Sequence, residues 1–267
     1  MNARRRFLAA LAVVCCSCAA GAFEKIAYVD GSDFAEVFDS ETREGTEKIV
    51  DHVLLTGADT ILWRTHSGAM PRYRSRCEDP DRLEAPFNRR RLPTTSKIHN
   101  WLRLWDEGVD PLSWVFETCA KRPQVRAVGF HALLEEAHWQ FVYLGQWNLD
   151  HPQFLCRKHD GTVQMYHASF AFPEVVAHRL QIVSELLERK PSVFFLDIFR
   201  NGGWGVDKEY TRPNFEEWER RHPGLPPPVK MSDPLWAEWA TVASRGFREY
   251  LKGVREQTRR AGARFLI

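Results

Sequence analysis

Three carboxylates in this chain follow apolar runs that are predicted to be strands. Asp197 ends the run Val193–Asp197, and Glu135 and Glu136 follow the run Val125–His131. Short apolar runs bounded by turn residues predict strands buried on both faces. A carboxylate at the end of such a strand is costly to bury without a partner or a chemical task. We therefore interpret Asp197 as a candidate nucleophile, and Glu135 or Glu136 as a candidate acid.

Each of these carboxylates also has a structural interpretation. Asp197 is an ordinary buried acid if it pairs with Arg200 or Arg64. Glu135 and Glu136 form a solvated pair if they lie on a loop or a short helix. The sequence leaves both interpretations open.

Candidate binding residues lie at or just after the same strand ends. Aromatic rings there suit the apolar face of a sugar, and polar side chains suit its hydroxyl groups. The alternative is that the tryptophans pack the core and that Asp30 caps a turn. The predicted binding residues are Tyr28, Asp30, Trp63, Arg64, His66, His131, Trp147, Arg200 and Trp204.

Four histidines raise the question of a metal site, namely His131, His138, His151 and His159. A zinc site needs three or four convergent ligands, often closely spaced in the sequence. These histidines are scattered among loop aromatics, so we expect no metal and no cofactor. A metal-dependent hydrolase that uses His131, His138 and Asp197 is the alternative.

The elements that position these residues alternate between strand and helix. Hydrophobic spacing, helix caps and turn residues delimit them. The predicted strands are Lys25–Asp30, Asp59–Arg64, Val125–His131, Val193–Asp197 and Ala263–Ile267, and the main predicted helices are Thr42–Leu55, Pro111–Ala120, Phe172–Glu188 and a long helix capped by Asp233. Long polar segments, numbered 66–100, 135–167 and 200–231, are predicted to be loops.

This alternation, with long loops only after strands, is typical of an α/β fold of the (β/α) TIM-barrel type. A flavodoxin-like open sheet is the alternative, but no phosphate-binding glycine motif supports it. A full barrel needs ~250 residues plus insertions. Because about four and a half units use all 267 residues, we expect an incomplete barrel that is truncated at its C-terminus.

Several segments together resemble a known family. They are the first strand with Tyr28 and Asp30, the strand Asp59–Trp63, the His131 strand, the segment Asn148–Gly161, the motif Pro173-Glu-Val175 and the strand end Phe195-Leu-Asp197. These residues resemble the secreted (β/α)8 barrels of glycosyl-hydrolase-like family 10, within the amylase-type superfamily. The resemblance is distributed over most of residues 26–267.

The resemblance implies retaining hydrolysis of O-glycosidic bonds, with Asp197 as the nucleophile. The general acid/base of such barrels follows the fifth strand, at or beyond Ile267. Retention needs two carboxyl groups about 5 Å apart. The expected function is therefore a secreted glycoside-hydrolase-like protein that acts on an oligosaccharide or polysaccharide. A non-catalytic carbohydrate-binding protein or an inactive truncated barrel is the alternative.

The first 22 residues are predicted to be a signal peptide, because Arg4-Arg5-Arg6 precedes an apolar run and a small-residue cleavage site at Ala20-Gly21-Ala22. We expect a secreted or periplasmic protein whose barrel domain spans residues 23–267. A lipoprotein anchor on Cys15, Cys16 or Cys18 is an alternative.

Charge and composition narrow the partners. The net charge of +2 and the lack of a binding motif argue against nucleic acid. No later run is long and apolar enough to cross a bilayer. Outside the predicted signal peptide, Cys77, Cys119 and Cys156 allow at most one internal disulfide, and we expect buried thiols. The arginine-rich segment 72–91 suits an anionic glycan, or else pairs with its own acidic residues.

Overall fold

The structure is a computed structural model of the 267-residue chain. It describes residues 14–16, 23–30, 42–67, 70–77, 103–104, 106–133, 137–138, 143–144, 146–198 and 205–267.

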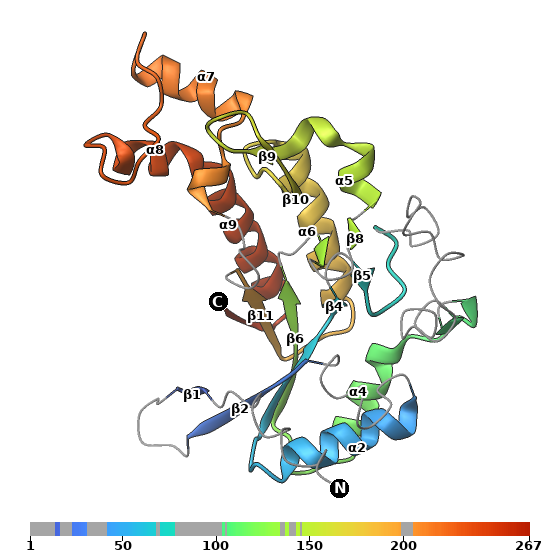
Figure 1. Ribbon diagram of the computed structural model, residues 1–267. Helices are drawn as coiled ribbons and strands as arrows, with labels where there is room; N and C mark the ends of the chain where they lie inside the picture. Colours follow the sequence, from blue (N-terminus) through green and yellow to red (C-terminus); the bar gives the residue numbers. More distant parts are fainter. Residues whose placement is uncertain are drawn as a thin grey trace, which may run out of the picture.

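A six-stranded sheet forms the centre of the molecule, in the order β1-β2-β3-β6-β11-β12 (Figure 1). Five of its strands are parallel, each paired with the next, and β1 is antiparallel to β2. The parallel strands are β2 (Glu24–Val29), β3 (Thr60–Arg64), β6 (Ala127–Leu133), β11 (Val193–Asp197) and β12 (Arg264–Leu266). The predicted α/β class, with a parallel sheet curled like part of a TIM-type barrel, is confirmed.

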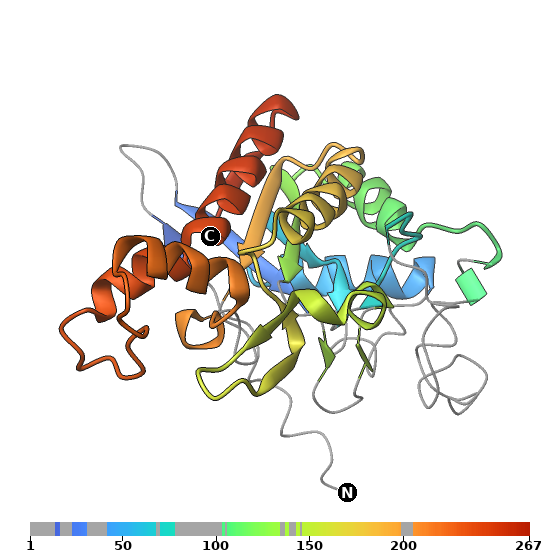
Figure 2. The ribbon, with the colours of Figure 1, turned by 90° about the horizontal axis from the view of Figure 1, so that it is seen from above.

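Four helices cover one face of this sheet and follow one another around it (Figure 2). They are α2 (Arg43–Leu54), α4 (Pro111–Ala120), α6 (Pro173–Leu187) and α9 (Arg245–Arg260). Side-chain caps mark the starts of α2 and α4. Thr42 Oγ1 accepts a hydrogen bond from the Gly45 amide at 2.9 Å, and Asp110 Oδ1 accepts one from the Leu112 amide at 3.1 Å. Both are N-terminal caps, which satisfy amides that lack a partner within the helix.

The two faces of the strands differ in burial. On the helix-covered face, Val29 and Phe194 are 0% exposed and belong to the main hydrophobic core. On the opposite, concave face, Tyr28 and Phe195 are only half-buried. Successive strand residues point to opposite faces, so the helix side of the sheet is a packed core and the concave side is partly open.

β1 (Val14–Cys16) lies inside the predicted signal peptide and pairs with Glu24–Ile26 of β2. The signal peptide itself stays a prediction. Within the described part of the chain, no helix is long and apolar enough to cross a membrane. Cys77, Cys119 and Cys156 are not joined by disulfide bonds.

Two segments that were predicted to be loops contain regular structure. Segment 135–167 includes an antiparallel pair, β9 with β10, and segment 200–231 includes a ten-residue helix, α7. The additional elements are β4 (His66–Ser67), β5 (Met70–Pro71), β7 (Ala137–His138), β8 (Tyr143–Leu144), α5 (Gln146–Asp150), η3 (Pro152–Phe154), β9 (Leu155–Arg157), β10 (Val163–Ala168), η5 (Val206–Lys208) and α7 (Arg212–Arg221).

The long helix predicted after Asp233 is two helices, α8 (Trp236–Ala243) and α9, which meet at Ser244. The prediction of a single helix was wrong because the apolar residues of this segment pack in two separate cores. Trp239 of α8 packs in a small aromatic core with Tyr210 and Trp218, whereas α9 packs in the main core. We call residues 205–243 the helical module; Figure 1 shows its helices beyond the carboxyl ends of β6 and β11.

Candidate functional site

The candidate site is formed by the carboxyl ends of four adjacent parallel strands. Asp30 directly follows β2, Arg64 ends β3 and Asp197 ends β11. Strand register places Arg64 beside His131 of β6, and Asp197 beside Leu133. Parallel strands end at one edge of a sheet. These positions therefore lie on the same rim, as the sequence predicted.

A buried ion cluster occupies the β2–β3 side of this rim. Arg64 Nη1 donates to Asp30 Oδ2 at 2.6 Å, and Arg72 Nη2 lies 3.8 Å from Asp30 Oδ1. The three side chains are almost fully buried, at 4% exposure for Asp30, 1% for Arg64 and 3% for Arg72. Burying a charge without a partner is costly, so the pairing explains how these groups are accommodated. Asp30 is bound by Arg64 and lies close to Arg72, and its sugar-binding role stays a prediction.

Arg72 reaches this cluster from the segment that follows β3. The Arg72 amide donates to the Thr65 carbonyl at 2.7 Å. Thr65 Oγ1 lies 2.8 Å from His66 Nδ1, and the His66 ring meets the edge of Tyr73 with centroids 5.6 Å apart. His66 is 6% exposed. The predicted binding residue His66 thus packs against Thr65 and Tyr73.

The two faces of the sheet carry different predicted site residues. Trp63 is 2% exposed and belongs to the main core on the helix side, opposite to the face of Arg64. Tyr28 and Asp197 are half-buried and share the concave face with Arg64. Trp63 therefore packs against helices, whereas Tyr28 and Asp197 line the partly open side of the sheet.

Trp147, the remaining aromatic residue of the predicted set within the described part of the chain, lies on α5 in a stack of rings. Its ring centroid is 4.5 Å from those of both His151 and His178, with interplanar angles of 25° and 8°. Phe154 is also stacked on it, at 5.8 Å. Burial lowers the pKa of His178 to about 4, with a smaller effect from His151. The Trp147 ring is engaged in packing against α6.

Five predicted site residues remain: Glu135, Glu136, His131, Arg200 and Trp204. Glu135, Glu136, Arg200 and Trp204 lie outside the described residues. For His131 the structure gives the strand position and register alone.

Among the described residues, no three His, Cys, Asp or Glu side chains are grouped so that they could hold a metal ion. Of the histidines considered as ligands, His151 Nδ1 lies 2.8 Å from the Trp147 carbonyl oxygen. His159 meets the edge of the Tyr210 ring at 6.0 Å.

Glu185 and Glu209 are among the buried carboxylates that sequence reasoning missed. Glu185 of α6 is 3% exposed and Glu209 is 0% exposed. Glu209 accepts hydrogen bonds from Ser169 Oγ, from Cys156 Sγ at 3.6 Å and from Asn214 Nδ2 at 3.3 Å. Burial, together with the adjacent Glu209, raises the pKa of Cys156 well above its ordinary value. Glu209 ties the β9–β10 pair to α7, and no feature of its local sequence marks it as buried.

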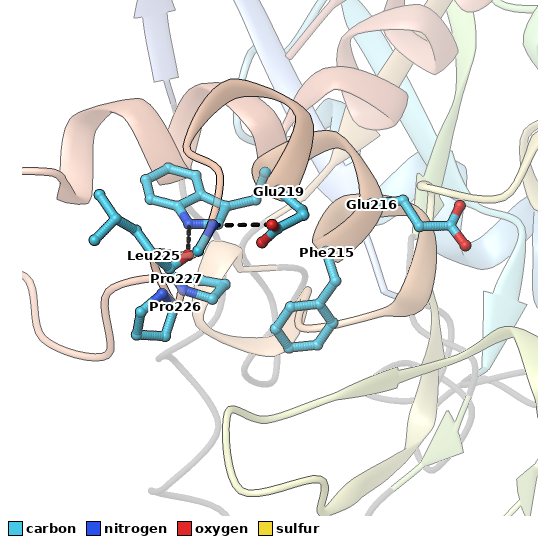
Figure 3. A pocket seen from close by; sticks show the side chains of 8 residues that line it. Phe215, Glu216, Glu219, Leu225, Pro226 and Pro227 are labelled. Carbon is cyan, nitrogen blue, oxygen red and sulfur yellow. Dashed lines mark hydrogen bonds between the residues drawn. The ribbon is translucent and has the colours of Figure 1, made fainter.

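An open pocket of about 610 Å³ lies on the helical module, between α7 and residues 224–227 (Figure 3). Its walls are mainly apolar, from Phe215, Leu225, Pro226 and Pro227. The Trp218 Nε1–H donates to the Leu225 carbonyl at 2.8 Å, and the Gly224 amide donates to Glu219 Oε1 at 2.9 Å. Among the described residues, no predicted site residue lines this pocket.

Comparisons with known proteins give distant structural likenesses. No protein-family model and no curated protein matches the chain, so none supports the predicted membership of glycosyl-hydrolase-like family 10. The fold is similar to the catalytic domain of β-amylase from Paenibacillus polymyxa, with a TM-score of 0.45 and 9% identity over 83% of this chain and 62% of that one. The chain thus spans less than two thirds of that domain. A hypothetical protein from Ruminiclostridium thermocellum ATCC 27405 gives a TM-score of 0.38 and 10% identity over 78% of this chain and 97% of that one.

Proposed function

We propose that the concave side of the sheet, at the carboxyl ends of its strands, binds an oligosaccharide or polysaccharide, and that Asp197 acts there on an O-glycosidic bond. Asp197 serves as nucleophile or as stabiliser of the positive charge that develops on the sugar. The observation that carries this proposal is the half-buried position of Asp197 at the end of β11. Ligands of α/β folds bind at this end of the strands.

The ion cluster separates the roles of the two rim aspartates. Asp30 is bonded to Arg64 at 2.6 Å and is 4% exposed, so it is a buried partner of an ion pair. Asp197 shares the concave face with the rings of Tyr28 and Phe195, all three being half-buried. Aromatic rings on the same face of a sheet as a carboxylate suit a sugar, which offers an apolar face and hydroxyl groups. Asp197 is the more exposed of these two aspartates and is therefore our candidate for the reaction.

Hydrolysis also requires an acid/base. Glycoside hydrolases use a pair of carboxyl groups, about 5 Å apart in retaining enzymes. We propose Glu135 or Glu136 for this role, because both follow β6, the strand beside β11. We also propose that the chain is exported, with residues 1–22 as its signal peptide.

Sugar binding without cleavage is the second candidate. It is favoured by the arginine-bound state of Asp30, which removes one rim carboxylate from catalysis. A site with one reactive carboxylate is expected to hold a sugar but to cleave it poorly.

The test uses the purified chain with maltohexaose, cellohexaose and chitohexaose, measuring binding by calorimetry and released reducing ends by a colorimetric assay. We expect D197N to lower turnover at least about 100-fold while the dissociation constant changes little. D207N, which removes an exposed carboxylate from the helical module, is the matched control and should retain turnover. Unchanged turnover in D197N would rule out the role of Asp197. Binding without reducing ends supports the second candidate, and no binding to any of the three sugars contradicts both.

A further inference from the structure

Glu185 lies in the last turn of α6, and both of its carboxylate oxygens face the segment that follows β3. Tyr73 Oη donates to Glu185 Oε2 at 3.3 Å, and Ser75 Oγ donates to the same oxygen at 2.8 Å. The Arg76 amide donates to Glu185 Oε1, and Arg76 Nε lies 3.5 Å from that oxygen. A single buried carboxylate thus binds three residues of one segment that is more than 100 positions away in the chain.

Further contacts fix Tyr73 and α6 to each other. The Arg189 guanidinium lies 4.7 Å from the centroid of the Tyr73 ring. Arg189 Nε also donates to Asp110 Oδ2 at 2.8 Å and Arg189 Nη1 to the Glu185 carbonyl at 2.9 Å. Asp110 caps α4. The start of α4, the Tyr73 ring and Glu185 therefore form one packed unit around Arg189.

Arg72 stands between this unit and the rim. Its amide is bonded to the Thr65 carbonyl, and the next residue, Tyr73, is bonded to Glu185. The Arg72 side chain lies 3.8 Å from Asp30 at the end of β2. Two anchors, one on each side of Arg72, therefore determine where its guanidinium lies.

We propose that Glu185 is a positioning residue for the candidate site: it holds segment 71–77 so that Arg72 lies against Asp30 and completes the ion cluster beneath the rim. Its effect on sugar binding rests on the proposed function, whereas its effect on Arg72 can be measured without any ligand.

The first test measures the reaction of individual arginines with phenylglyoxal, followed by mass spectrometry. Arg72 is 3% exposed and should be protected in the native chain, whereas Arg74, two residues away, is exposed and should react. We expect E185M, which removes every acceptor at similar volume, to label Arg72 at least tenfold faster. E185Q retains a carbonyl acceptor and should lie between E185M and the native chain. Arg64, at 1% exposure, should stay protected in both variants.

The matched control is E188Q. Glu188 Oε1 binds Arg76 Nη2 at 2.5 Å, but both side chains are more than half exposed. This variant loses a contact to the same segment without touching the buried carboxylate, so Arg72 should remain protected. Protection of Arg72 in a folded E185M would overturn the proposal. If E185M does not fold, E185Q and S75A decide it by the same labelling. Joint labelling of Arg72 and Arg64 in E185Q would also overturn the proposal, because it indicates general loosening.

The second test is a double-mutant cycle on the affinity for maltohexaose, cellohexaose and chitohexaose. If Glu185 acts through Arg72, E185Q and R72M should each weaken binding several-fold, and the double variant should bind no more weakly than R72M. If the effects of E185Q and R72M on affinity multiply in the double variant, Glu185 does not act on binding through Arg72. If the native chain binds none of these sugars, the proposed function fails, and the labelling alone decides whether Glu185 positions Arg72.

Discussion

Arg264 and Glu24 form an ion pair although they lie 240 positions apart in the chain. Arg264 Nη1 donates to Glu24 Oε2 at 2.7 Å, and Arg264 Nη2 donates to Glu24 Oε1. Glu24 begins β2 and Arg264 begins β12, which are the first and last parallel strands of the sheet. These strands are not neighbours, so the pair spans the concave face. The sheet is therefore curled enough for its two ends to touch through side chains.

We expect R264Q to lower the free energy of unfolding by about 1 kcal/mol at pH 7, as for a partly exposed ion pair. The hydrogen bond from Arg264 is the main cause that lowers the pKa of Glu24. A depressed carboxyl pKa stabilises the fold above the ordinary value near 4.5, and this contribution is lost as pH falls below it. Urea unfolding at pH 7 and pH 3 should therefore show a difference at pH 7 that shrinks at pH 3. R259Q, which breaks an ion pair within α9, is the control, and an equal effect of both would contradict the prediction.

D30N should be far more damaging than a comparable change at an exposed pair. It removes the charge that faces the buried Arg64 and Arg72, and breaking a buried pair costs about 3–5 kcal/mol because a charge is left uncompensated. D51N, which breaks the more exposed pair with Arg122, should cost less than about 1 kcal/mol. Urea unfolding of both variants measures the difference. Similar losses in D30N and D51N would mean that the ion cluster is not energetically buried.

His178 should make stability depend on pH. Its folded pKa of about 4 lies below the ordinary value of 6.5 because the ring is buried. The unfolded chain therefore binds the proton first, and stability falls as pH drops from 6.5 toward 4. The full effect is about 3 kcal/mol at 1.36 kcal/mol per pKa unit. H178F keeps a ring against Trp147 and cannot titrate, so urea unfolding of this variant should vary less with pH across this window. An equal pH dependence in both proteins would exclude His178 as its source.

The three thiols outside the N-terminal segment should differ in reactivity. Burial raises the pKa of Cys119 to about 12, and Cys156 is fully buried beside Glu209. Cys77 is half-buried. Because the thiolate is the reactive form, iodoacetamide at pH 8 should label Cys77 first, with peptide mass spectrometry as the measurement. Cys119 and Cys156 should react only after urea is added. Rapid labelling of Cys156 in the native chain would contradict its burial.

Much of the sheet could be predicted because its signals are local. Apolar runs predicted β3 and β11, and helical spacing of apolar residues predicted α2, each to within a residue or two. The predicted helix Pro111–Ala120 matches α4. The prediction failed where a single pattern served two environments, as in the helix broken at Ser244. It also missed α7, whose ten residues include only two large apolar side chains, Phe215 and Trp218.

The sequence predicted which residues lie at the strand ends, but it did not predict their ion-pair partners. The sequence offered Arg64 as a partner of Asp197, whereas the structure pairs Arg64 with Asp30 on the adjacent strand. The alignment of β2 with β3 places Asp30 beside Arg64, and the sequence alone does not give that alignment. The role of Glu185 depends on donors from a distant segment, so no pattern within α6 distinguishes it from a solvated helix residue.

The break at Ser244 has a consequence for how the protein tolerates change. The helical module packs Trp218 and Trp239 in a core of its own, separate from that of the sheet. Substitutions in cores with no shared partners usually have additive effects on stability. Replacements in the aromatic core around Trp218 and Trp239 should therefore cost little stability in β2 and β11, whereas Glu209 couples the module to the β9–β10 pair.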